Sequence, residues 1–329
     1  MGKTFQALTC FQDEENCYKI EIREKSIDDL PEGDLIVRVE YSSLNYKDAL
    51  SASGAKGITR IYPHTPGIDA AGIVVDSSDI NFPEGTQVIV SGYDLGVNTC
   101  GGFGQYIKVP NSWVIKCPDN LSTKEAMMIG TAGLTAGFSV DAILNHISLN
   151  EAEVVVSGAT GGVGSISVNL MSLLGAKVSA VTGKSDVDNY LFDLGATRII
   201  QRDKYIKETN QPLSKGVFHA AVDVAGGETL SSILACMRYE GVVTCCGNVG
   251  GAEFDTSVFP FILRGNSLIG IDTAEKPLHY KEKIWHRFST EWKLTGLDTV
   301  CNEVNLNSLE AEIKKILKGQ MLGRVIVKL

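Results

Sequence analysis

The fold is decided by residues 154–164, which read Val-Val-Val-Ser-Gly-Ala-Thr-Gly-Gly-Val-Gly. Three apolar residues lead into a turn whose small residues Ala159, Gly161 and Gly164 follow a Gly/Ala-x-Gly-x-x-Gly spacing, and apolar residues then recur at helical spacing. This pattern predicts a strand, a tight turn and a helix. In that arrangement the helix amino terminus offers free N–H groups and a positive dipole end to a dinucleotide pyrophosphate. We therefore predict a dinucleotide site here, with Ala159 as a mild departure from the usual first glycine.

The segment after the turn indicates which dinucleotide binds. The predicted helix leads through Gly175 into a second β-rich run at 178–181, which completes a strand-helix-strand unit of about 30 residues. NAD-binding units carry an acidic residue about 20 residues past the glycines. Here those positions hold Thr182, Gly183, Lys184 and Ser185. A lysine and hydroxyl groups suit a 2′-phosphate, which favours NADP(H) over NAD(H). The alternative is that Lys184 is an ordinary solvated lysine of a loop.

Size and composition are those of a soluble globular enzyme with two domains. The chain has 329 residues, of which 44% are hydrophobic and 21% charged. A formal net charge of -9 disfavours nucleic acid as a partner. Because no apolar run approaches a membrane span and the amino terminus lacks a signal pattern, we expect a cytoplasmic protein without a membrane partner. The eight cysteines form no Cys-x-x-Cys pair, which argues against a disulfide framework and a structural zinc site.

The order of predicted elements indicates the domain organisation. Runs of β type fill residues 4–116 without alternating helices, which predicts a small all-β barrel or roll. From residue 154 onward, six apolar strands alternate with helical segments and predict a doubly wound parallel sheet. These strands are expected at residues 154–156, 178–181, 198–200, 217–223, 241–247 and 267–271. The last part of the chain must return to the first domain. The predicted domains are therefore residues 1–123 completed by 273–329, and residues 124–272.

Two features of the first half of the chain each have two interpretations. Asp69 is an isolated acid among apolar neighbours, and it is either a functional carboxylate or a residue that caps a turn through its own backbone. A capping box of Ser122 and Glu125 opens a helix that leads into a run of small residues at 130–136. We expect this run, which contains Thr131 and Thr135, to lie close to a nicotinamide ring. Close packing of helices is the alternative.

Together these features resemble the medium-chain dehydrogenase/reductase superfamily. The resemblance rests on the β-rich first domain, the Ala-Thr-Gly-Gly-Val-Gly turn, the run Gly-Thr-Ala-Gly-Leu-Thr-Ala and the ending Gly-Arg-Val-Ile-Val-Lys-Leu. Residues 42–50, 66–72 and 260–264 look like its quinone oxidoreductase/acrylyl-CoA reductase branch, the YhdH/YhfP family. The resemblance covers essentially the whole chain. It implies an α/β protein in which a GroES-like β-rich catalytic domain accompanies a Rossmann nucleotide-binding domain.

The resemblance also bears on metal binding. Zinc-dependent members of the superfamily place a Cys ligand near the position of Asn45 and a Gly-His-Glu sequence near residues 67–69. Here Ile68 stands where that His would be, and only Cys100 lies in the region of the structural zinc lobe. We therefore expect no bound metal. Without a Lewis acid to polarise an alcohol oxygen, the resemblance implies reduction of an activated C=C bond or a quinone.

Individual residues acquire roles from the same resemblance. Tyr46 is implied to lie beside the nicotinamide, and Asn45 and Tyr46 are implied to donate hydrogen bonds to the substrate oxygen on which charge develops. The other residues expected to bind the cofactor are those of the pyrophosphate turn (Ala159, Thr160, Gly161, Gly162, Val163, Gly164), the 2′-phosphate site (Thr182, Gly183, Lys184, Arg202) and the nicotinamide half (Thr131, Thr135, Asn248, Ile262, Thr273).

The implied activity is NADPH-dependent transfer of hydride to the activated C=C of an α,β-unsaturated thioester, such as an acyl-CoA, or of an enone, or to a quinone. The alternative is an NADPH-binding protein without turnover. We also expect a homodimer, because the apolar sheet edge at Ser267–Ile271 is a liability if it stays open and the resemblance implies pairing across a two-fold axis. A monomer whose carboxy-terminal helices cover that edge is the alternative.

Overall fold

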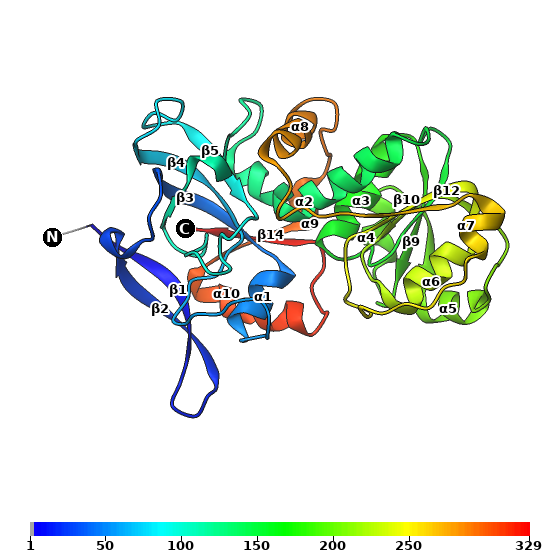
Figure 1. The fold of residues 1–329 in the computed structure, drawn as a ribbon, viewed down its shortest axis with the longest axis horizontal. Helices are drawn as coiled ribbons and strands as arrows, with labels where there is room; N and C mark the ends of the chain where they lie inside the picture. The colour runs from blue at the N-terminus through cyan, green and yellow to red at the C-terminus, as the bar shows by residue number, and fades with distance from the viewer. Residues whose placement is uncertain (1–2) are drawn as a thin grey trace. The chain divides into compact units, whose positions relative to one another are not determined.

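A computed structural model describes residues 3–329, which form two compact units (Figure 1). Unit 1 contains the residues up to Thr131 together with Ala274–Glu291 and Leu297–Leu329. Unit 2 contains Ala132–Thr273 and Trp292–Gly296. The border between the units falls inside a long helix, α2 (Thr123–Leu144), rather than ahead of it. The predicted α/β class, a β-rich unit and a unit with a parallel sheet, is confirmed.

Unit 1 consists of an amino-terminal hairpin and a seven-stranded sheet. The hairpin pairs β1 (Thr4–Gln12) with β2 (Tyr18–Ser26). The larger sheet has the order β14-β15-β3-β4-β5-β7, and β6 pairs with β3. Its strands are β3 (Leu35–Leu44), β4 (Asp69–Ser77), β5 (Gln87–Ser91), β6 (Tyr106–Val109), β7 (Val114–Lys116), β14 (Cys301–Asn305) and β15 (Arg324–Lys328). The pairing is antiparallel throughout this sheet except between β14 and β15.

Alternating side chains explain why most of these strands were predictable and one was not. In β3, Leu35, Val37 and Val39 enter the buried core while Arg38 faces solvent, which is the period-two pattern of a half-buried strand. By contrast, β14 reads Cys-Asn-Glu-Val-Asn and buries none of its side chains completely. Its strand conformation depends on parallel pairing with the apolar β15. The sequence therefore contains no strong local signal for it.

Four α-helices and two short 3-10 turns complete unit 1. They are α1 (Tyr46–Ala52), α8 (Leu278–Ser289), α9 (Leu297–Val300), α10 (Leu306–Leu317) and the turns Ile27–Asp29 and Asn111–Trp113. Ala49 and Ala52 of α1 share one buried cluster with Leu309 and Ile313 of α10. This packing fixes the position of α1, and with it the residue at its start, Tyr46.

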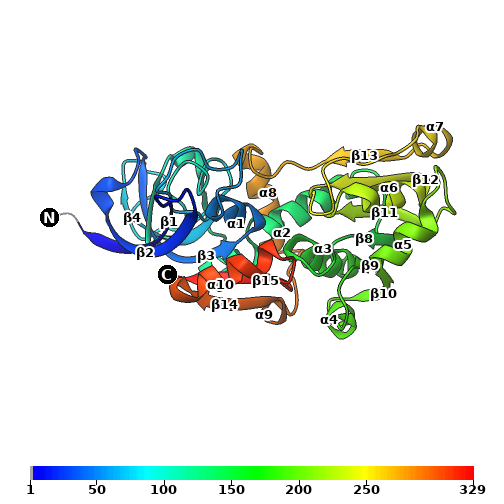
Figure 2. The same ribbon diagram turned by 90° about the horizontal axis from the view of Figure 1, so that it is seen from below.

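Unit 2 is built on a six-stranded parallel sheet (Figure 2). The order β10-β9-β8-β11-β12-β13 is the doubly wound order 3-2-1-4-5-6 of dinucleotide-binding folds. The strands are β8 (Glu153–Val156), β9 (Lys177–Thr182), β10 (Ala196–Gln201), β11 (Phe218–Asp223), β12 (Met237–Cys245) and β13 (Ser267–Gly270), and the helices are α3 (Gly162–Leu173), α4 (Asp188–Asp193), α5 (Arg202–Thr209), α6 (Gly227–Ala235) and α7 (Phe259–Arg264). All six predicted strands are confirmed, whereas α5 and α7 were not predicted.

The helix α2 opens with the predicted capping box. The N–H of Ser122 donates to Glu125 Oε2 (2.9 Å), and the N–H of Glu125 donates to Ser122 Oγ (3.1 Å). Gly130, at φ 51° and ψ -160°, interrupts the helix between its two halves. Contrary to the sequence expectation, α2 is long and apolar enough to cross a membrane by length and composition. Most of it is buried inside the protein, which is the property of a core helix.

Candidate functional site

The carboxyl ends of the parallel strands in unit 2 meet at one edge of the sheet, where ligands bind in doubly wound folds. Most of the predicted cofactor residues lie along this edge. The glycine turn follows β8, Thr182 ends β9, Arg202 follows β10, Asn248 comes after β12 and Thr273 comes after β13. The strand order reverses between β8 and β11, next to the glycine turn. The structure therefore brings together residues that are up to 114 positions apart, from Ala159 to Thr273.

The glycine turn has the geometry expected of an anion site. Gly158 adopts a positive φ of 56°, and Gly161 is the residue that precedes the first turn of α3. No side chain caps this end of α3, so its first N–H groups are not used by a capping residue. A Cβ at Gly164 would collide with the carbonyl oxygen of Gly158, and only glycine lets the helix close onto the turn. Backbone donors at a helix amino terminus suit a pyrophosphate.

A buried carboxylate ties together the two strands that flank this point. Ser157 Oγ, after β8, donates to Asp223 Oδ1 at the end of β11 (2.6 Å) and accepts from the N–H of Val224 (2.8 Å). The N–H of Gly226 donates to Asp223 Oδ2 (2.9 Å). Burial raises the pKa of Asp223, and these hydrogen bonds oppose the rise. Asp223 thus fixes the carboxyl ends of β8 and β11, the two strands between which the strand order reverses, relative to each other.

The residues predicted to bind a 2′-phosphate lie next to one another. The guanidinium of Arg202 covers Gly183, because a Cβ on Gly183 would lie 2.9 Å from Arg202 Cζ. The N–H of Lys184 donates to Thr182 Oγ1 (3.1 Å), and burial lowers the pKa of the Lys184 ammonium. Arg202 Nε also donates to Asp203 Oδ1 (3.0 Å). Two cations and a hydroxyl at the end of β9 match the charge and the acceptors of a phosphate.

The nicotinamide half of the predicted site contains a pair of buried hydroxyl groups. Thr135 Oγ1 and Thr273 Oγ1 lie 2.8 Å apart, and either can be the donor. Asn248 is exposed in the turn that follows β12. These three residues lie within unit 2.

Ile262 does not belong with them. It lies on α7, whose last residue, Arg264, donates to the carbonyls of Ala235 (2.9 Å) and Met237 (2.7 Å), and Met237 begins β12. This helix therefore lies at the amino end of the strands, on the opposite edge of the sheet. The side chain of Ile262 is 69% exposed there. Within one copy of the chain Ile262 is therefore separated from Thr135 and Thr273, because the Pro-Phe-Ile-Leu-Arg stretch leads into the start of β13 and not out of its end. Its assignment to the nicotinamide half stays a prediction.

In unit 1, Tyr46 and Asn45 lie in different environments. Tyr46 is 37% exposed, and its hydroxyl makes no hydrogen bond within residues 3–329. Asn45 is buried, and its Nδ2 donates to Ser43 O (3.2 Å) and Asp69 Oδ2 (2.8 Å). Both amide hydrogens of Asn45 are therefore engaged inside the protein. This geometry favours Tyr46 over Asn45 as the donor to the substrate, and the predicted role of each residue stays a prediction.

Asp69 is the centre of a buried hydrogen-bond network. Besides the bond from Asn45, its Oδ2 accepts from Ser43 Oγ (2.6 Å) and from the N–H of Thr131 (2.9 Å), and its Oδ1 accepts from Thr131 Oγ1 (2.6 Å). None of these donors is the neighbouring backbone, so Asp69 is not a local turn cap. Both donors of Thr131 are used in unit 1, which favours a structural role for Thr131 over the predicted contact with the cofactor.

Arg324, at the start of β15, provides the cation of this network. Its side chain is buried, its Nη1 donates to Asn45 Oδ1 (3.0 Å) and its Nη2 donates to Ser43 Oγ (2.7 Å). Burial lowers the pKa of Arg324, and Asp69 opposes this effect. A Cβ on Gly130 would lie 2.6 Å from Arg324 Nη2 and 2.8 Å from Asp69 Oδ2. Gly130 therefore interrupts α2 at the point where Arg324 and Asp69 occupy the space that a side chain would need.

A second buried acid, Asp48, holds the start of α1. Its oxygens accept from the N–H groups of Asn45 (2.8 Å), Ile68 (2.8 Å) and Gly67 (3.1 Å). Burial raises the pKa of Asp48 to about 7, against the effect of these bonds. Asp48 links the segment before β4 to the helix that carries Tyr46.

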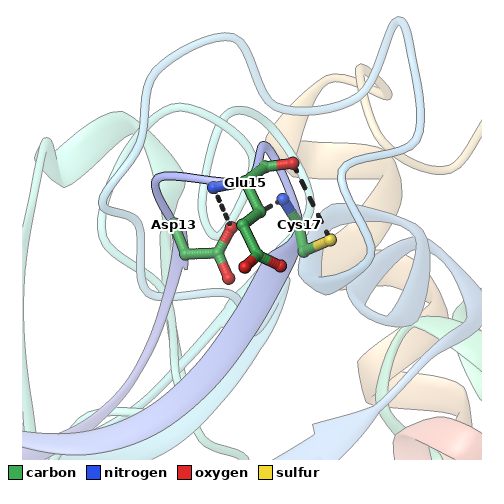
Figure 3. Close-up of side chains that lie close together, drawn as sticks. All are labelled: Asp13, Glu15 and Cys17. Carbon is green, nitrogen blue, oxygen red and sulfur yellow. Dashed lines mark hydrogen bonds between the residues drawn. The ribbon is translucent and has the colours of Figure 1, made fainter.

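The position that binds catalytic zinc elsewhere in the superfamily does not fit a metal ion here. Ile68 has no ligand atom in its side chain, and Asp69 already accepts four hydrogen bonds. In the turn between β1 and β2, Asp13, Glu15 and Cys17 have ligand atoms within 4.8 Å of one another (Figure 3). There Asp13 Oδ1 accepts from the N–H groups of Glu15 and Cys17. Hydrogen bonds of this kind are typical of a tight turn, so the turn itself explains why these three side chains lie close together.

Arg324, Asp48 and Ser43 were missed by sequence reasoning. Arg324 and Asp48 do carry a signal, because each is a charged residue inside a mostly apolar stretch. Such a charge is buried only when it is paired or hydrogen-bonded. The sequence does not contain the identity of the partner, which comes from another part of the chain.

Two family models match the chain. The model described as "Alcohol dehydrogenase GroES-like domain" matches residues 31–119, and the model described as "Zinc-binding dehydrogenase" matches residues 162–290.

Relatives of similar length are known. "Putative quinone oxidoreductase YhfP" of Bacillus subtilis is 43% identical over 100% of both chains. "Acrylyl-CoA reductase AcuI" of Ruegeria pomeroyi is 38% identical over 98% of both chains.

Two solved structures that are similar to this chain contain a bound dinucleotide. The Salmonella enterica yhdH oxidoreductase in complex with NADP is 37% identical, with a TM-score of 0.94 over 98% of this chain and 99% of that one. Bacillus subtilis yhfP with NAD bound is 41% identical, with a TM-score of 0.96 over 100% of both chains. The two relatives therefore hold different dinucleotides.

Proposed function

Because this chain belongs to the medium-chain dehydrogenase/reductase superfamily, in the branch of the YhfP, YhdH and AcuI oxidoreductases, we propose that it is an NADPH-dependent reductase of activated C=C bonds or quinones. The observation that carries the proposal is the carboxyl edge of the sheet in unit 2, where the glycine turn lies beside Thr182, Lys184 and Arg202. Residues 124–272 bind the nucleotide, and residues 1–123 with 273–329 bind the acceptor.

The residues at this edge fit NADPH. The N–H groups of the glycine turn hold the pyrophosphate, Lys184 and Arg202 pair with the 2′-phosphate, and Thr135, Thr273 and Asn248 line the nicotinamide half. When bound, NADPH supplies a hydride to the β-carbon of the acceptor. Relatives are solved with NADP and with NAD, so the two cations at Gly183 are the feature that supports NADPH for this chain.

The acceptor is an α,β-unsaturated thioester or ketone, or a quinone, since the carbonyl of each such molecule takes up the charge of the arriving hydride. Tyr46 donates its hydroxyl hydrogen to that carbonyl oxygen. Asn45 does not touch the acceptor; together with Asp69 and Arg324 it holds the start of α1 in position.

The reaction does not use zinc. Ile68 replaces a ligand and Asp69 is saturated with hydrogen bonds, so no residue at this position is free to hold the ion. Exhaustive chelation is expected to leave the activity unchanged, and elemental analysis is expected to find no stoichiometric zinc. A zinc ion that the activity requires would overturn this part of the proposal.

A second copy of the chain pairs with the edge strand β13. This strand is the last of the sheet, and exposed apolar side chains accompany it on the preceding segment, including Val258, Ile262 and Leu263. An open apolar edge invites pairing, and a two-fold axis lets two such edges satisfy one another.

Measurement of NADPH oxidation with acrylyl-CoA, methyl vinyl ketone and benzoquinone tests the proposal. Turnover with at least one of these acceptors is expected. Tight binding of NADPH without turnover of any acceptor would instead support a cofactor-binding protein without enzymatic activity.

A further inference from the structure

Unit 1 contains a buried lysine whose charge has no role in the proposed reaction. Lys281, in α8, is 1% exposed, although lysine is almost never fully buried unless it is paired. Its Nζ donates to the carbonyls of Ser91 (2.8 Å) and Ala274 (2.9 Å) and lies 3.5 Å from the centre of the Tyr93 ring. Because a buried ammonium is costly unless its hydrogens are bonded, these acceptors indicate which segments the charge serves.

One acceptor is the residue at which the chain returns to unit 1. This part of unit 2 ends at Thr273, and Ala274 follows in unit 1. The carbonyl of Ala274 also accepts a hydrogen bond from the N–H of Tyr93 (3.0 Å). A Cβ on Gly92 would lie 2.9 Å from Ala274 O and 3.0 Å from Ala274 Cα, so the backbone of Gly92 packs directly against Ala274. The ammonium of Lys281, the N–H of Tyr93 and the backbone of Gly92 therefore hold Ala274 together.

The loop after β5 has an uncommon backbone conformation where it makes these contacts. Gly92 has a φ of 78°, and Tyr93 has a φ of 53°, a left-handed value that is rare for a bulky side chain. The Tyr93 ring stacks on Trp113 with ring centroids 5.7 Å apart, and its hydroxyl donates to the carbonyl of Lys276 (3.1 Å). Such a backbone persists only where surrounding contacts impose it. The Tyr93 loop thus holds residues 274–276 in one conformation.

The other acceptor of Lys281 belongs to the strand pair that contains Asp69. Ser91 is the last residue of β5 and lies opposite Asp69, the first residue of β4. The carboxylate of Asp69 is the centre of the buried network that holds the residues before α1. Through two carbonyls, Lys281 therefore connects the end of β5 beside Asp69 with the segment that follows Thr273.

Thr273, the residue before Ala274, is proposed to line the nicotinamide half of the site, and its hydroxyl lies 2.8 Å from that of Thr135. We propose that Lys281 is a positioning residue of the reductase: its ammonium fixes Ala274 and so holds Thr273 where it contacts the nicotinamide of NADPH. The inference rests on the proposed function. Because its side chain is buried, Lys281 acts through Ala274 and not by contact with the acceptor. A contact residue that is already ordered loses less freedom when the cofactor binds.

The test compares two ligands that differ in the nicotinamide. NADPH contains this ring, and 2′-phospho-ADP-ribose is the same molecule without it. Lys281→Met keeps an unbranched side chain and removes the ammonium. It is expected to weaken NADPH binding about ten-fold, the value of a hydrogen bond to a charged group, and to leave the binding of 2′-phospho-ADP-ribose nearly constant. Isothermal titration calorimetry measures both dissociation constants, and their ratio is the readout that a merely structural role would not change.

A matched control separates this effect from lost stability. Val88→Ala, in the same strand as Ser91, removes methyl groups from a completely buried side chain and is expected to lower stability but to keep the wild-type ratio. If circular dichroism shows that Lys281→Met is unfolded, Tyr93→Phe tests the same segment, because it removes the donor to Lys276 O. It is expected to shift the ratio in the same direction. A wild-type ratio in the folded variant would overturn the role of Lys281.

Failure of the reductase proposal would give a different result. A wild type that binds NADPH but reduces none of acrylyl-CoA, methyl vinyl ketone and benzoquinone would refute the reductase. The ratio of the two dissociation constants would still decide whether Lys281 positions Thr273 for the nicotinamide. A wild type that binds neither ligand would refute both proposals.

Discussion

Asp69 Oδ2 and Arg324 Nη2 lie 4.0 Å apart, and both atoms are hydrogen-bonded to the hydroxyl of Ser43. Ser43 accepts from Arg324 and donates to Asp69, and the amide of Asn45 bridges the two charges in the same direction. Both charged groups are buried, so each depends on the other and on the bridging groups. Arg324 also donates to the carbonyl of Leu44, which lies 280 positions earlier in the chain. The residues before α1 are consequently held by a side chain of β15.

The first prediction concerns the stability of this network. Arg324→Met leaves the Asp69 carboxylate buried without its cation and is expected to lower the free energy of unfolding by about 3–5 kcal/mol. The double variant Asp69→Asn/Arg324→Met is expected to lose less than the sum of the two single variants. Urea denaturation measures these values. Arg23→Met, which removes an exposed pair with Glu21, is the control and is expected to change little; equal losses in Arg324→Met and Arg23→Met would contradict the account.

The second prediction concerns cofactor choice. Lys184→Ala and Arg202→Ala are each expected to weaken NADPH binding by about ten- to a hundred-fold, the value of a charge-assisted hydrogen bond. NADH lacks the 2′-phosphate, so its affinity is expected to stay nearly constant. Fluorescence titration measures both dissociation constants. Lys177→Ala, at the opposite end of β9, is the control. An equal loss of NADPH and NADH binding would exclude Lys184 and Arg202 as the 2′-phosphate site.

The third prediction concerns Tyr46. Tyr46→Phe removes one hydroxyl from an exposed side chain and is expected to lower kcat by about 10- to 100-fold, because a hydrogen bond to developing charge is lost. The affinity for NADPH is expected to remain, since Tyr46→Phe does not change the residues of the glycine turn. Tyr239→Phe, at a residue of unit 2 that is 72% exposed, is the control. Unchanged kcat in Tyr46→Phe would assign the donor role to another group.

The fourth prediction concerns pH. An Asp side chain in an unfolded chain has a pKa of about 3.9, and burial raises the pKa of Asp48 to about 7 in the folded protein. Between these values the folded state binds a proton that the unfolded state has released. The contribution of Asp48 to stability is therefore largest at low pH and is lost as the pH rises to about 7. Urea midpoints from pH 5 to pH 8 are expected to fall more steeply in the wild type than in Asp48→Asn; parallel curves would rule out this titration.

The fifth prediction concerns assembly. Light scattering at micromolar concentration is expected to show a dimer, and Ile262→Glu/Leu263→Glu is expected to dissociate it while NADPH binding is retained. The charges would be buried beside β13 in the dimer but exposed in the monomer. Ile80→Glu, at a side chain of unit 1 that is 92% exposed, is the control. A monomeric wild type would refute pairing along β13.

The nucleotide-binding half of the protein was predictable because its signals are local. Residues 154–164 place strand, turn and helix in eleven consecutive positions, and the six strands of unit 2 follow from apolar runs separated by helices. Once the strands are parallel, their carboxyl ends lie at one edge, so the positions of Thr182, Arg202, Asn248 and Thr273 follow from topology. The assignment of Ile262 does not follow from topology, because it rests on resemblance alone and the chain segment that contains it runs to the other edge of the sheet.

Local pattern and topology thus determined the strands, the glycine turn and the edge of the sheet where the cofactor residues gather. Only the tertiary structure decided which side chains are free to act. Asn45 and Tyr46 are neighbours in sequence, yet Asp69 and Arg324 engage the amide of Asn45 from both sides while the hydroxyl of Tyr46 stays unbonded within residues 3–329. The guanidinium of Arg202 on Gly183 is a contact of the same kind. Such contacts depend on where distant strands bring their side chains, and periodicity along the chain does not contain that information.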